Sequence, residues 1–144
     1  MIEHLTTPPP RSLGLALRKG LAGHCPQCGK GRIFGSYLKV LPECSVCHED
    51  LSPQRADDLP AYIVLFIVGH IVIGGMLTAE TYSEWPVMWH VILWPTLTFI
   101  LSLSLLPRVK GAVIGLQWAL RMHGFSKRPD GDDHPLFQPS ESLL

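Results

Sequence analysis

The sequence predicts a small membrane protein with a cytoplasmic zinc ribbon built on a β-hairpin, an antiparallel pair of transmembrane helices and a C-terminal helix at the membrane surface. Three observations predict this fold class. All four cysteines fall in two Cys-x-x-Cys pairs. Two uncharged, apolar runs follow, each about twenty residues long, which is the length of a bilayer crossing. Lysines and arginines occur before the first run and after the second but not in the connection between them, so they flank the pair on one side of the membrane only.

Composition excludes some classes of partner. The 144 residues include 12 Lys and Arg and 12 Asp and Glu, so the formal net charge is zero. Such a chain has no overall attraction to nucleic acid or to anionic lipid. The N-terminus lacks the basic start and apolar core of a cleaved signal peptide. We expect disorder in the proline-rich residues 1–11 and in the polar tail, residues 126–144.

Residues 12–23 are expected to form a short amphipathic helix. Ser12 is a suitable N-cap, and leucines and alanines recur along one side of the segment. Gly20 and Gly23 favour an end just before the first cysteine pair. The helix is expected either to pack on the ribbon or to lie on the membrane surface.

Residues 24–51 contain the predicted metal site. Fifteen residues separate the two cysteine pairs, which is the spacing of a structural four-thiolate zinc site. The predicted ligands are Cys25, Cys28, Cys44 and Cys47, and the predicted cofactor is Zn²⁺. Iron in a rubredoxin-like site, disulfides and a redox dithiol are the alternatives.

The residue after each second cysteine is expected to have a positive φ. Gly29 suits that conformation, and histidine, which stands at position 48, tolerates it. His48 as a replacement ligand is the alternative for that position. Between the pairs, β-prone residues 32–34 and 37–40 flank Gly35-Ser36, which predicts a β-hairpin. So small a unit buries little apolar surface, and structural zinc contributes about 10 to 16 kcal/mol to such folds.

The membrane region follows a linker, residues 52–59, whose Asp57 and Asp58 are expected to cap the first span. The predicted segments are a transmembrane helix at 60–79, a periplasmic turn at 80–86, a second transmembrane helix at 87–106 and an interfacial helix at 109–123. The turn has no Lys or Arg, whereas the far ends of the spans carry several, so both termini are expected in the cytoplasm. In the interfacial helix, Gly111 and Gly115 are expected to face a neighbour or the lipid.

His70 lies near the middle of the first span, where an ionisable residue is a functional hypothesis by default. His90 lies about 9 Å away in depth, at 1.5 Å per residue, so the two are not expected to share haem or copper. Pro95 cannot donate to the Val91 carbonyl. The sequence therefore predicts a hydrogen bond from His70 to that carbonyl or to Thr96, across the helical pair.

Several motifs resemble a known family when taken together. They are Arg-Lys-Gly-Leu-x-Gly-x-Cys-Pro-x-Cys-Gly-x-Gly-Arg-Ile-Phe at residues 18–34, the second cysteine pair, Asp-x-Pro-Ala-Tyr at 58–62, Gly-His-Ile at 69–71, Trp-Pro at 94–95, Lys-Gly-Ala at 110–112, Gln-Trp-Ala at 117–119 and His-Gly-Phe at 123–125. This set resembles the bacterial family catalogued as domain of unknown function 983, over residues 11–126. His48, where the family often has glycine, departs from the pattern.

The resemblance implies a small protein of the bacterial inner membrane with a zinc ribbon, two spans and no assigned activity. Relatives of this kind tend to be encoded near haem-copper oxidase subunits and their assembly factors, which implies a role in respiratory complex biogenesis. The residues themselves show no nucleophile-base-acid set and no phosphate-binding loop, so no enzyme is predicted.

The functional hypothesis is a non-enzymatic adaptor or assembly protein whose ribbon docks a partner beside a membrane complex. Its expected partners are the lipid bilayer and another membrane protein, with no small-molecule substrate. Electron transfer or thiol chemistry at the four cysteines is the main rival. A nucleic-acid-binding ribbon is a second, because Lys30, Arg32 and Lys39 form a positive side, although nearby carboxylates offset it.

Overall fold

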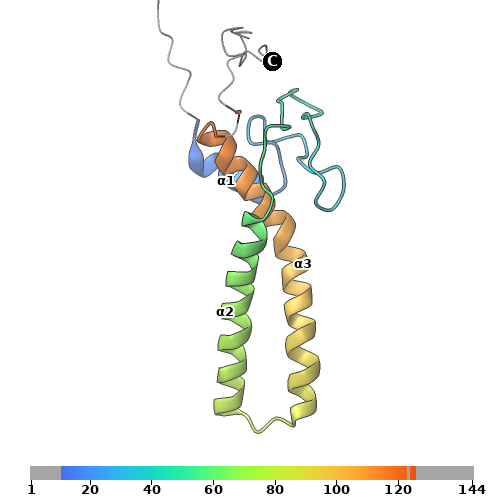
Figure 1. The fold of residues 1–144 in the computed structure, drawn as a ribbon, viewed down its shortest axis with the longest axis vertical. Helices are drawn as coiled ribbons and strands as arrows, with labels where there is room; N and C mark the ends of the chain where they lie inside the picture. Colours follow the sequence, from blue (N-terminus) through green and yellow to red (C-terminus); the bar gives the residue numbers. More distant parts are fainter. Residues whose placement is uncertain (1–10, 123, 126–144) are drawn as a thin grey trace, which may run out of the picture.

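The computed structural model describes residues 11–122, 124 and 125. It contains three helices, α1 (Leu13–Leu21), α2 (Leu59–Tyr82) and α3 (Val87–Ala119). Figure 1 shows α2 and α3 side by side as an antiparallel stalk, with a compact head at one end. We call residues 11–58, 107–122, 124 and 125 the head. The disorder expected at 1–10 and 126–144 lies outside the described residues.

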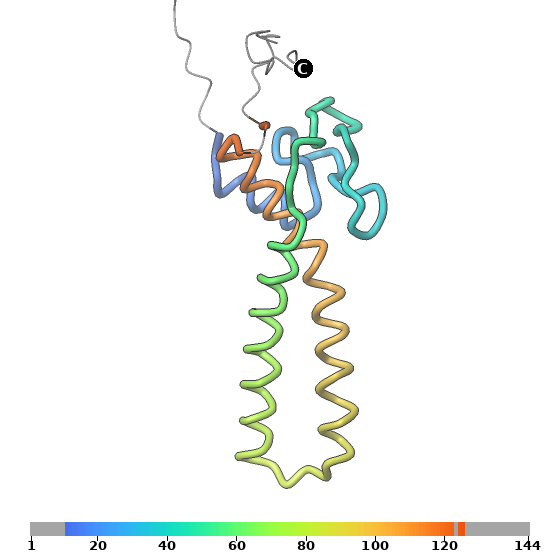
Figure 2. The backbone as a smooth tube through the Cα atoms, in the orientation of Figure 1, coloured from blue at the N-terminus to red at the C-terminus, as the bar shows by residue number. Residues whose placement is uncertain are grey.

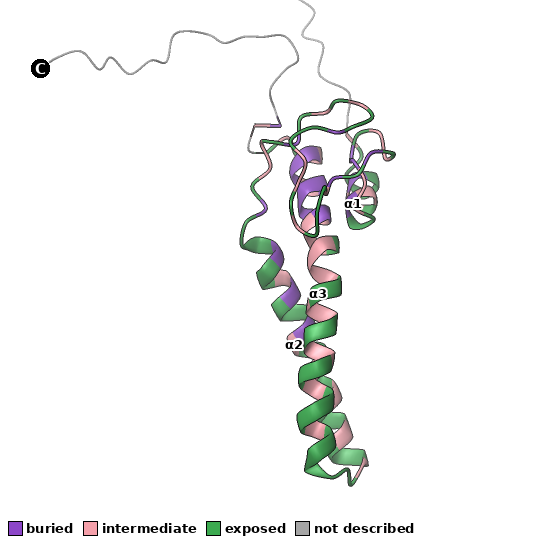
Figure 3. Ribbon diagram, turned by 90° about the vertical axis from the view of Figure 1, so that its right-hand side faces the viewer, coloured by how far each residue is buried: buried purple, intermediate pink, exposed green. Residues whose placement is uncertain are grey.

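The stalk has the properties of a membrane-spanning pair. Both helices are long and apolar enough to cross a membrane. At 1.5 Å per residue the 24 residues of α2 extend about 36 Å, which exceeds a hydrocarbon core of about 30 Å. Most of their side chains are exposed, as the green colour of the stalk in Figure 3 shows. Core helices of soluble proteins are covered instead, so these helices and the cysteine cluster fit a membrane protein.

α2 begins almost where the sequence predicts. Pro60 lies in its first turn, where a missing N–H removes no helical hydrogen bond. The expected capping by carboxylates is wrong for Asp58: it occupies the N-cap position, but its side chain makes no capping hydrogen bond. Residues 83–86 link α2 to α3, a shorter connection than the expected turn at 80–86.

α3 is one helix where the sequence predicted two. The expected transmembrane helix at 87–106 and interfacial helix at 109–123 are joined through Pro107, and the helix ends at Ala119. Above the stalk α3 bends, and its upper end lies beside α1 within the head (Figures 1 and 2). Pro107 has no N–H to donate to the Leu103 carbonyl, four residues earlier. The Tyr37 hydroxyl donates to that carbonyl instead, so the helix continues with a bend rather than ending.

The α1 helix packs closely on the upper part of α3. A Cβ added to Gly20 would lie 2.2 Å from the Gly111 carbonyl oxygen, and one added to Gly115 would lie 2.4 Å from that of Ala16. Only small residues allow this backbone approach. Of the two expectations for Gly111 and Gly115, the one that holds is contact with a neighbouring helix, which is α1, rather than with lipid. The same contact shows that α1 packs on α3 and not only on the predicted ribbon.

The core of the head lies between residues 22–58 and α3. It consists of Ile33, Leu51, Ala56, Val113 and Ile114. Beside it, the buried Gln117 side chain accepts from the Arg55 backbone N–H at 3.0 Å and donates to the Arg55 carbonyl at 2.7 Å. This pair of bonds fixes the linker to α3, because losing either would leave a buried polar group unpaired.

The β-hairpin predicted within residues 24–51 is wrong. Among the described residues this region has isolated bridges only, which pair His24 with Arg32, Phe34 with Val40, and Glu43 with Asp50. A two-stranded hairpin is marginal by itself. Two backbone hydrogen bonds flank the Phe34–Val40 bridge, from Gly35 to Lys39 at 3.0 Å and from Leu41 to Ile33 at 2.8 Å, but the pairing does not extend into strands.

The predicted bond across the stalk is also wrong. The His70 ring is exposed, and its Nδ1 donates to the Phe66 carbonyl at 2.7 Å, one turn earlier in the same helix. The Thr96 hydroxyl donates to the Ile92 carbonyl at 2.7 Å. Each side chain therefore uses the nearest carbonyl of its own helix.

Arg11 belongs to the ordered head rather than to the expected disordered segment. Its guanidinium lies 4.1 Å from the centre of the Trp118 ring, and its Nη1 donates to the Trp118 carbonyl at 2.6 Å. The indole Nε1 of Trp118 in turn donates to Glu49 at 2.6 Å. A cation on an aromatic face and a charged hydrogen bond thus fasten the N-terminal end of α1 to the end of α3.

Candidate metal centre

The two cysteine pairs form backbone turns of the same kind. The Gly29 N–H donates to the Cys25 carbonyl at 2.8 Å, and the His48 N–H donates to the Cys44 carbonyl at 3.0 Å. Gly29 has a φ of 71° and His48 a φ of 58°. The positive φ predicted at both positions is confirmed, although only glycine adopts it without strain.

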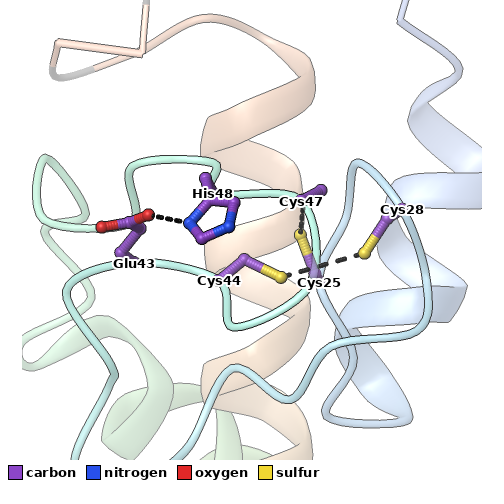
Figure 4. Close-up of polar contacts among 6 residues, drawn as sticks. All are labelled: Cys25, Cys28, Glu43, Cys44, Cys47 and His48. Carbon is purple, nitrogen blue, oxygen red and sulfur yellow. Dashed lines mark hydrogen bonds and ion pairs between the residues drawn. The ribbon is translucent and has the colours of Figure 1, made fainter.

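The four predicted ligands come together in the head. Their sulfur atoms all lie within 4.8 Å of one another. Cys25 Sγ is 3.7 Å from Cys47 Sγ, and Cys28 Sγ is 3.8 Å from Cys44 Sγ (Figure 4). Four sulfurs bound tetrahedrally at about 2.3 Å would be separated by about 3.8 Å. The cluster therefore has the size and the donor set to hold a metal ion.

Backbone amides favour the thiolate of Cys28. The Gly31 N–H lies 3.5 Å from its sulfur and the Lys30 N–H lies 3.4 Å away. These hydrogen bonds lower the pKa of Cys28 to about 6, so this thiol is ionised at neutral pH. The thiolate is the form that binds metal.

Burial acts in the opposite direction on two other ligands. Desolvation raises the pKa of Cys25 and of Cys47 above the ordinary thiol value. A bound cation would stabilise their thiolates and release their protons. The site is thus arranged so that Cys28 is ready to bind a metal ion, whereas the thiolates of Cys25 and Cys47 would be stabilised by the ion itself.

Sequence reasoning missed two residues that shape the site. Gly31 is buried, and a Cβ added there would lie 2.3 Å from Cys44 Sγ. Lys19 of α1 donates from Nζ to the Pro26 carbonyl at 3.2 Å and to the Gln27 carbonyl at 2.9 Å, which ties α1 to the first turn. Two glycines in Cys-Gly-Lys-Gly were a signal for the first, whereas nothing local indicated the second.

The histidines beside the cysteines are not part of the cluster. His48 is exposed, and its Nδ1 pairs with the Glu43 carboxylate (Figure 4). His24 is paired in a β-bridge with Arg32. In the part of the chain that the structure describes, the four cysteines are the only group of three or more His, Cys, Asp or Glu side chains close enough to share a metal ion. The alternative in which His48 replaces a cysteine is therefore not supported.

Much of the chain matches a known protein family. The family described as "Protein of unknown function (DUF983)" matches residues 34–118. The chain belongs to this family. The matched region contains the second cysteine pair, all of α2 and α3 up to Trp118, so the DUF983 resemblance expected from the motifs is confirmed. The match begins after the first cysteine pair, and the description assigns no activity. No curated protein and no solved structure matches the chain.

Proposed function

We propose that this DUF983 protein is a non-catalytic adaptor of the bacterial inner membrane, which presents a zinc-stabilised head to a partner beside the bilayer. The observation that carries the proposal is the closed set of four cysteine sulfurs within 4.8 Å. Catalytic zinc sites keep one position open for water or substrate, whereas sites with four protein thiolates are structural. Such a set supports a role in shaping a surface rather than in a reaction.

The distribution of cations supports a cytoplasmic head. Arg55 precedes α2, and Arg108 and Lys110 lie where α3 enters the head, whereas the link at residues 83–86 has no Lys or Arg. Positively charged flanks remain on the cytoplasmic side of bacterial membranes. The proposed topology therefore has both termini in the cytoplasm and the link in the periplasm.

The attachment of the head supports docking rather than free tethering. The hydroxyl of Tyr37 and the ammonium of Lys110 join residues 37–38 to α3, and Gln117 joins the linker to it. A partner that binds the head is thereby held at a defined position relative to the stalk. We propose another membrane protein as that partner, and the DUF983 resemblance suggests a haem-copper oxidase subunit or one of its assembly factors.

Purification in mild detergent tests the adaptor role. The Cys25→Ser, Cys28→Ser double variant removes two ligands, and His48→Asn is the control because His48 lies in the second turn but outside the sulfur cluster. We expect wild type and the control to retain zinc and to co-purify the same membrane proteins, and the double variant to lose both. Equal recovery of the same partners with the double variant would contradict docking through the head.

Electron transfer by iron is the second candidate, and one observation favours it. Cys28 is only partly buried, and its sulfur accepts hydrogen bonds from two backbone N–H groups. Such bonds tune the potential of iron–thiolate centres. Iron would colour the purified protein and bleach on reduction, whereas a zinc protein is colourless and unresponsive to reductant.

A further inference from the structure

An open pocket of about 420 Å³ lies beside the first cysteine turn. Its polar lining comes from His24, Arg32, Ser36 and Tyr37. The bridge between His24 and Arg32 is antiparallel, and directly opposed residues of such a bridge project their side chains from the same face. The backbone therefore directs an imidazole and a guanidinium into one pocket.

The charge of the pocket is unbalanced. No carboxylate occurs among the described residues that line it. Arg32 is exposed, and within residues 11–122, 124 and 125 its guanidinium has no hydrogen-bond or ion-pair partner. Arginine presents donors in a planar fork that matches phosphate oxygens. The pocket thus offers an unused phosphate-binding group next to the hydroxyl of Ser36.

The depth of the pocket follows from the contacts of its neighbouring residues. The Tyr37 hydroxyl donates to Leu103, and Lys110 donates to the Leu38 carbonyl at 3.0 Å. Leu103 lies one helical turn, about 5 Å, inside the end of the uncharged run at Leu106. Figure 1 shows the loop that carries Tyr37 reaching down beside α3 to the level where α2 begins.

With the stalk inserted as proposed and the uncharged run ending at Leu106 taken as the edge of the hydrocarbon core, these contacts put the pocket in the headgroup layer. That layer is about 5 to 8 Å thick on each side of a hydrocarbon core of about 30 Å. Tyr37 then lies where amphipathic aromatic side chains prefer to be, at the boundary between core and headgroups. Arg32 and His24 line the same pocket as Tyr37.

We propose that this pocket binds the phosphodiester of an anionic lipid headgroup. Arg32 donates to the phosphate oxygens, and His24 and Ser36 complete the contact. The inference rests on the proposed insertion of the stalk into a bilayer, but it is independent of the adaptor role. Its consequence is that lipid would hold the loop bearing Tyr37, and with it the first cysteine turn, against the membrane.

The test is a lipid titration of the full chain, purified with its metal in mild detergent and observed by native mass spectrometry. The probes are phosphatidylglycerol and phosphatidylcholine. The test variant is Arg32→Gln, and Arg18→Gln is the matched control because it removes the same charge from an exposed position of α1 that does not line the pocket. His24→Gln is a second test variant, and retained zinc reports an intact head in each protein.

We expect wild type and Arg18→Gln to bind phosphatidylglycerol in preference to phosphatidylcholine. Arg32→Gln should bind phosphatidylglycerol at least about tenfold more weakly, as the loss of a charged hydrogen bond predicts, and His24→Gln should lose less. Equal weakening by Arg18→Gln and Arg32→Gln would overturn the site, because attraction to charge alone would explain it. Release of the bound lipid by millimolar inorganic phosphate would overturn the assignment to lipid in favour of a free anion. Neither of these results would change which protein partners co-purify with the chain. Failure of the lipid site can therefore be told apart from failure of the adaptor proposal.

Discussion

Gly31 controls the approach of the two cysteine turns. Its missing Cβ leaves room for Cys44 Sγ, which would otherwise lie 2.3 Å from it, and its N–H is near Cys28 Sγ. The first contact joins the first turn to the second, and the second contact lies within the first turn. Because neither a sulfur nor a backbone can move away without disturbing the cluster, the position has no tolerance for a side chain.

We therefore expect Gly31→Ala to lose most of its zinc. The added methyl group would push Cys44 out of the tetrahedral arrangement, and apparent zinc binding of about 10 to 16 kcal/mol is what such a small fold depends on. Metal content after gel filtration is the measurement, with Lys30→Ala as the control because that exposed side chain lies outside the cluster. Normal zinc content in Gly31→Ala would show that the turns are less tightly constrained than the structure indicates.

At this scale the sequence predicted which four cysteines come together but not what surrounds them. Ligand identity follows from the cysteine spacing, and the positive φ at His48 follows from its place after a Cys-x-x-Cys turn. Two other sets of contacts join separate segments of the chain. They are the hydrogen bonds from Lys19 to the Pro26 and Gln27 carbonyls and the close approach of Gly31 to Cys44. Such contacts depend on how the chain folds back on itself, which local patterns do not encode.

The α3 helix shows how a neighbouring element alters the effect of a proline. Read locally, Pro107 ends a span, because it removes one helical bond and crowds the preceding turn. In the structure the Tyr37 hydroxyl donates the hydrogen bond that the Leu103 carbonyl would otherwise lack. Lys110 donates to the carbonyl of the adjacent residue, Leu38. The interface between loop and helix therefore explains why α3 is continuous where the sequence predicted two helices.

A double-mutant cycle tests this coupling. Tyr37→Phe should destabilise the head by about 1 kcal/mol when Pro107 is present, since it leaves the Leu103 carbonyl unpaired. In the Pro107→Ala background the alanine N–H can bond to that carbonyl, so the same change should cost clearly less. The measurement is denaturant-induced zinc release, and equal costs in the two backgrounds would mean that Tyr37 does not compensate for the proline.

The contact between α1 and α3 depends on glycine in the same way. Gly115→Ala should separate the helices, because its Cβ would lie 2.4 Å from the Ala16 carbonyl oxygen. We expect a loss of about 1 to 3 kcal/mol, as for other overpacked positions. Gly14→Ala is the matched control, because a Cβ there meets nothing within 4 Å and favours the helix. Zinc release under denaturant compares the two, and equal stability would mean that the helices are not in this close contact.

The sequence predicted secondary-structure elements best where a long run of residues has a uniform apolar composition. The two apolar runs predicted α2 and the lower part of α3 within a few residues. The β-hairpin failed because the pairing of residues 33–41 stops after one bridge and its flanking hydrogen bonds. The His70 prediction failed because its ring bonds to the Phe66 carbonyl of its own helix. In the second case a nearer partner decided the structure.

At the scale of the whole molecule, a head that contains the four-cysteine cluster sits on a stalk of two long apolar helices. The apolar, exposed surface of the stalk fits a lipid environment, and the cations at its upper end support the proposed cytoplasmic head. The orientation is testable with Ser83→Cys in the link. A membrane-impermeant thiol reagent added to spheroplasts should label this variant and leave wild type unlabelled, because the four native cysteines lie in the head. Labelling only after lysis would reverse the topology.

Metal removal has a consequence of the same scale. A chelator should unfold the cysteine turns and expose their thiols, while the stalk stays inserted because its helices are satisfied by their own backbone bonds. Circular dichroism should then report retained helix while thiol reagents report four reactive cysteines. Loss of most of the helical signal with the metal would show that the stalk depends on the head.

Metal analysis with a visible spectrum of the gently purified full chain is the most direct test for a structural zinc ion in the closed four-thiolate site. We expect about one zinc ion per chain and no absorption in the visible range. Stoichiometric iron with a visible spectrum that bleaches on reduction would contradict it and would identify the head as an electron-transfer centre.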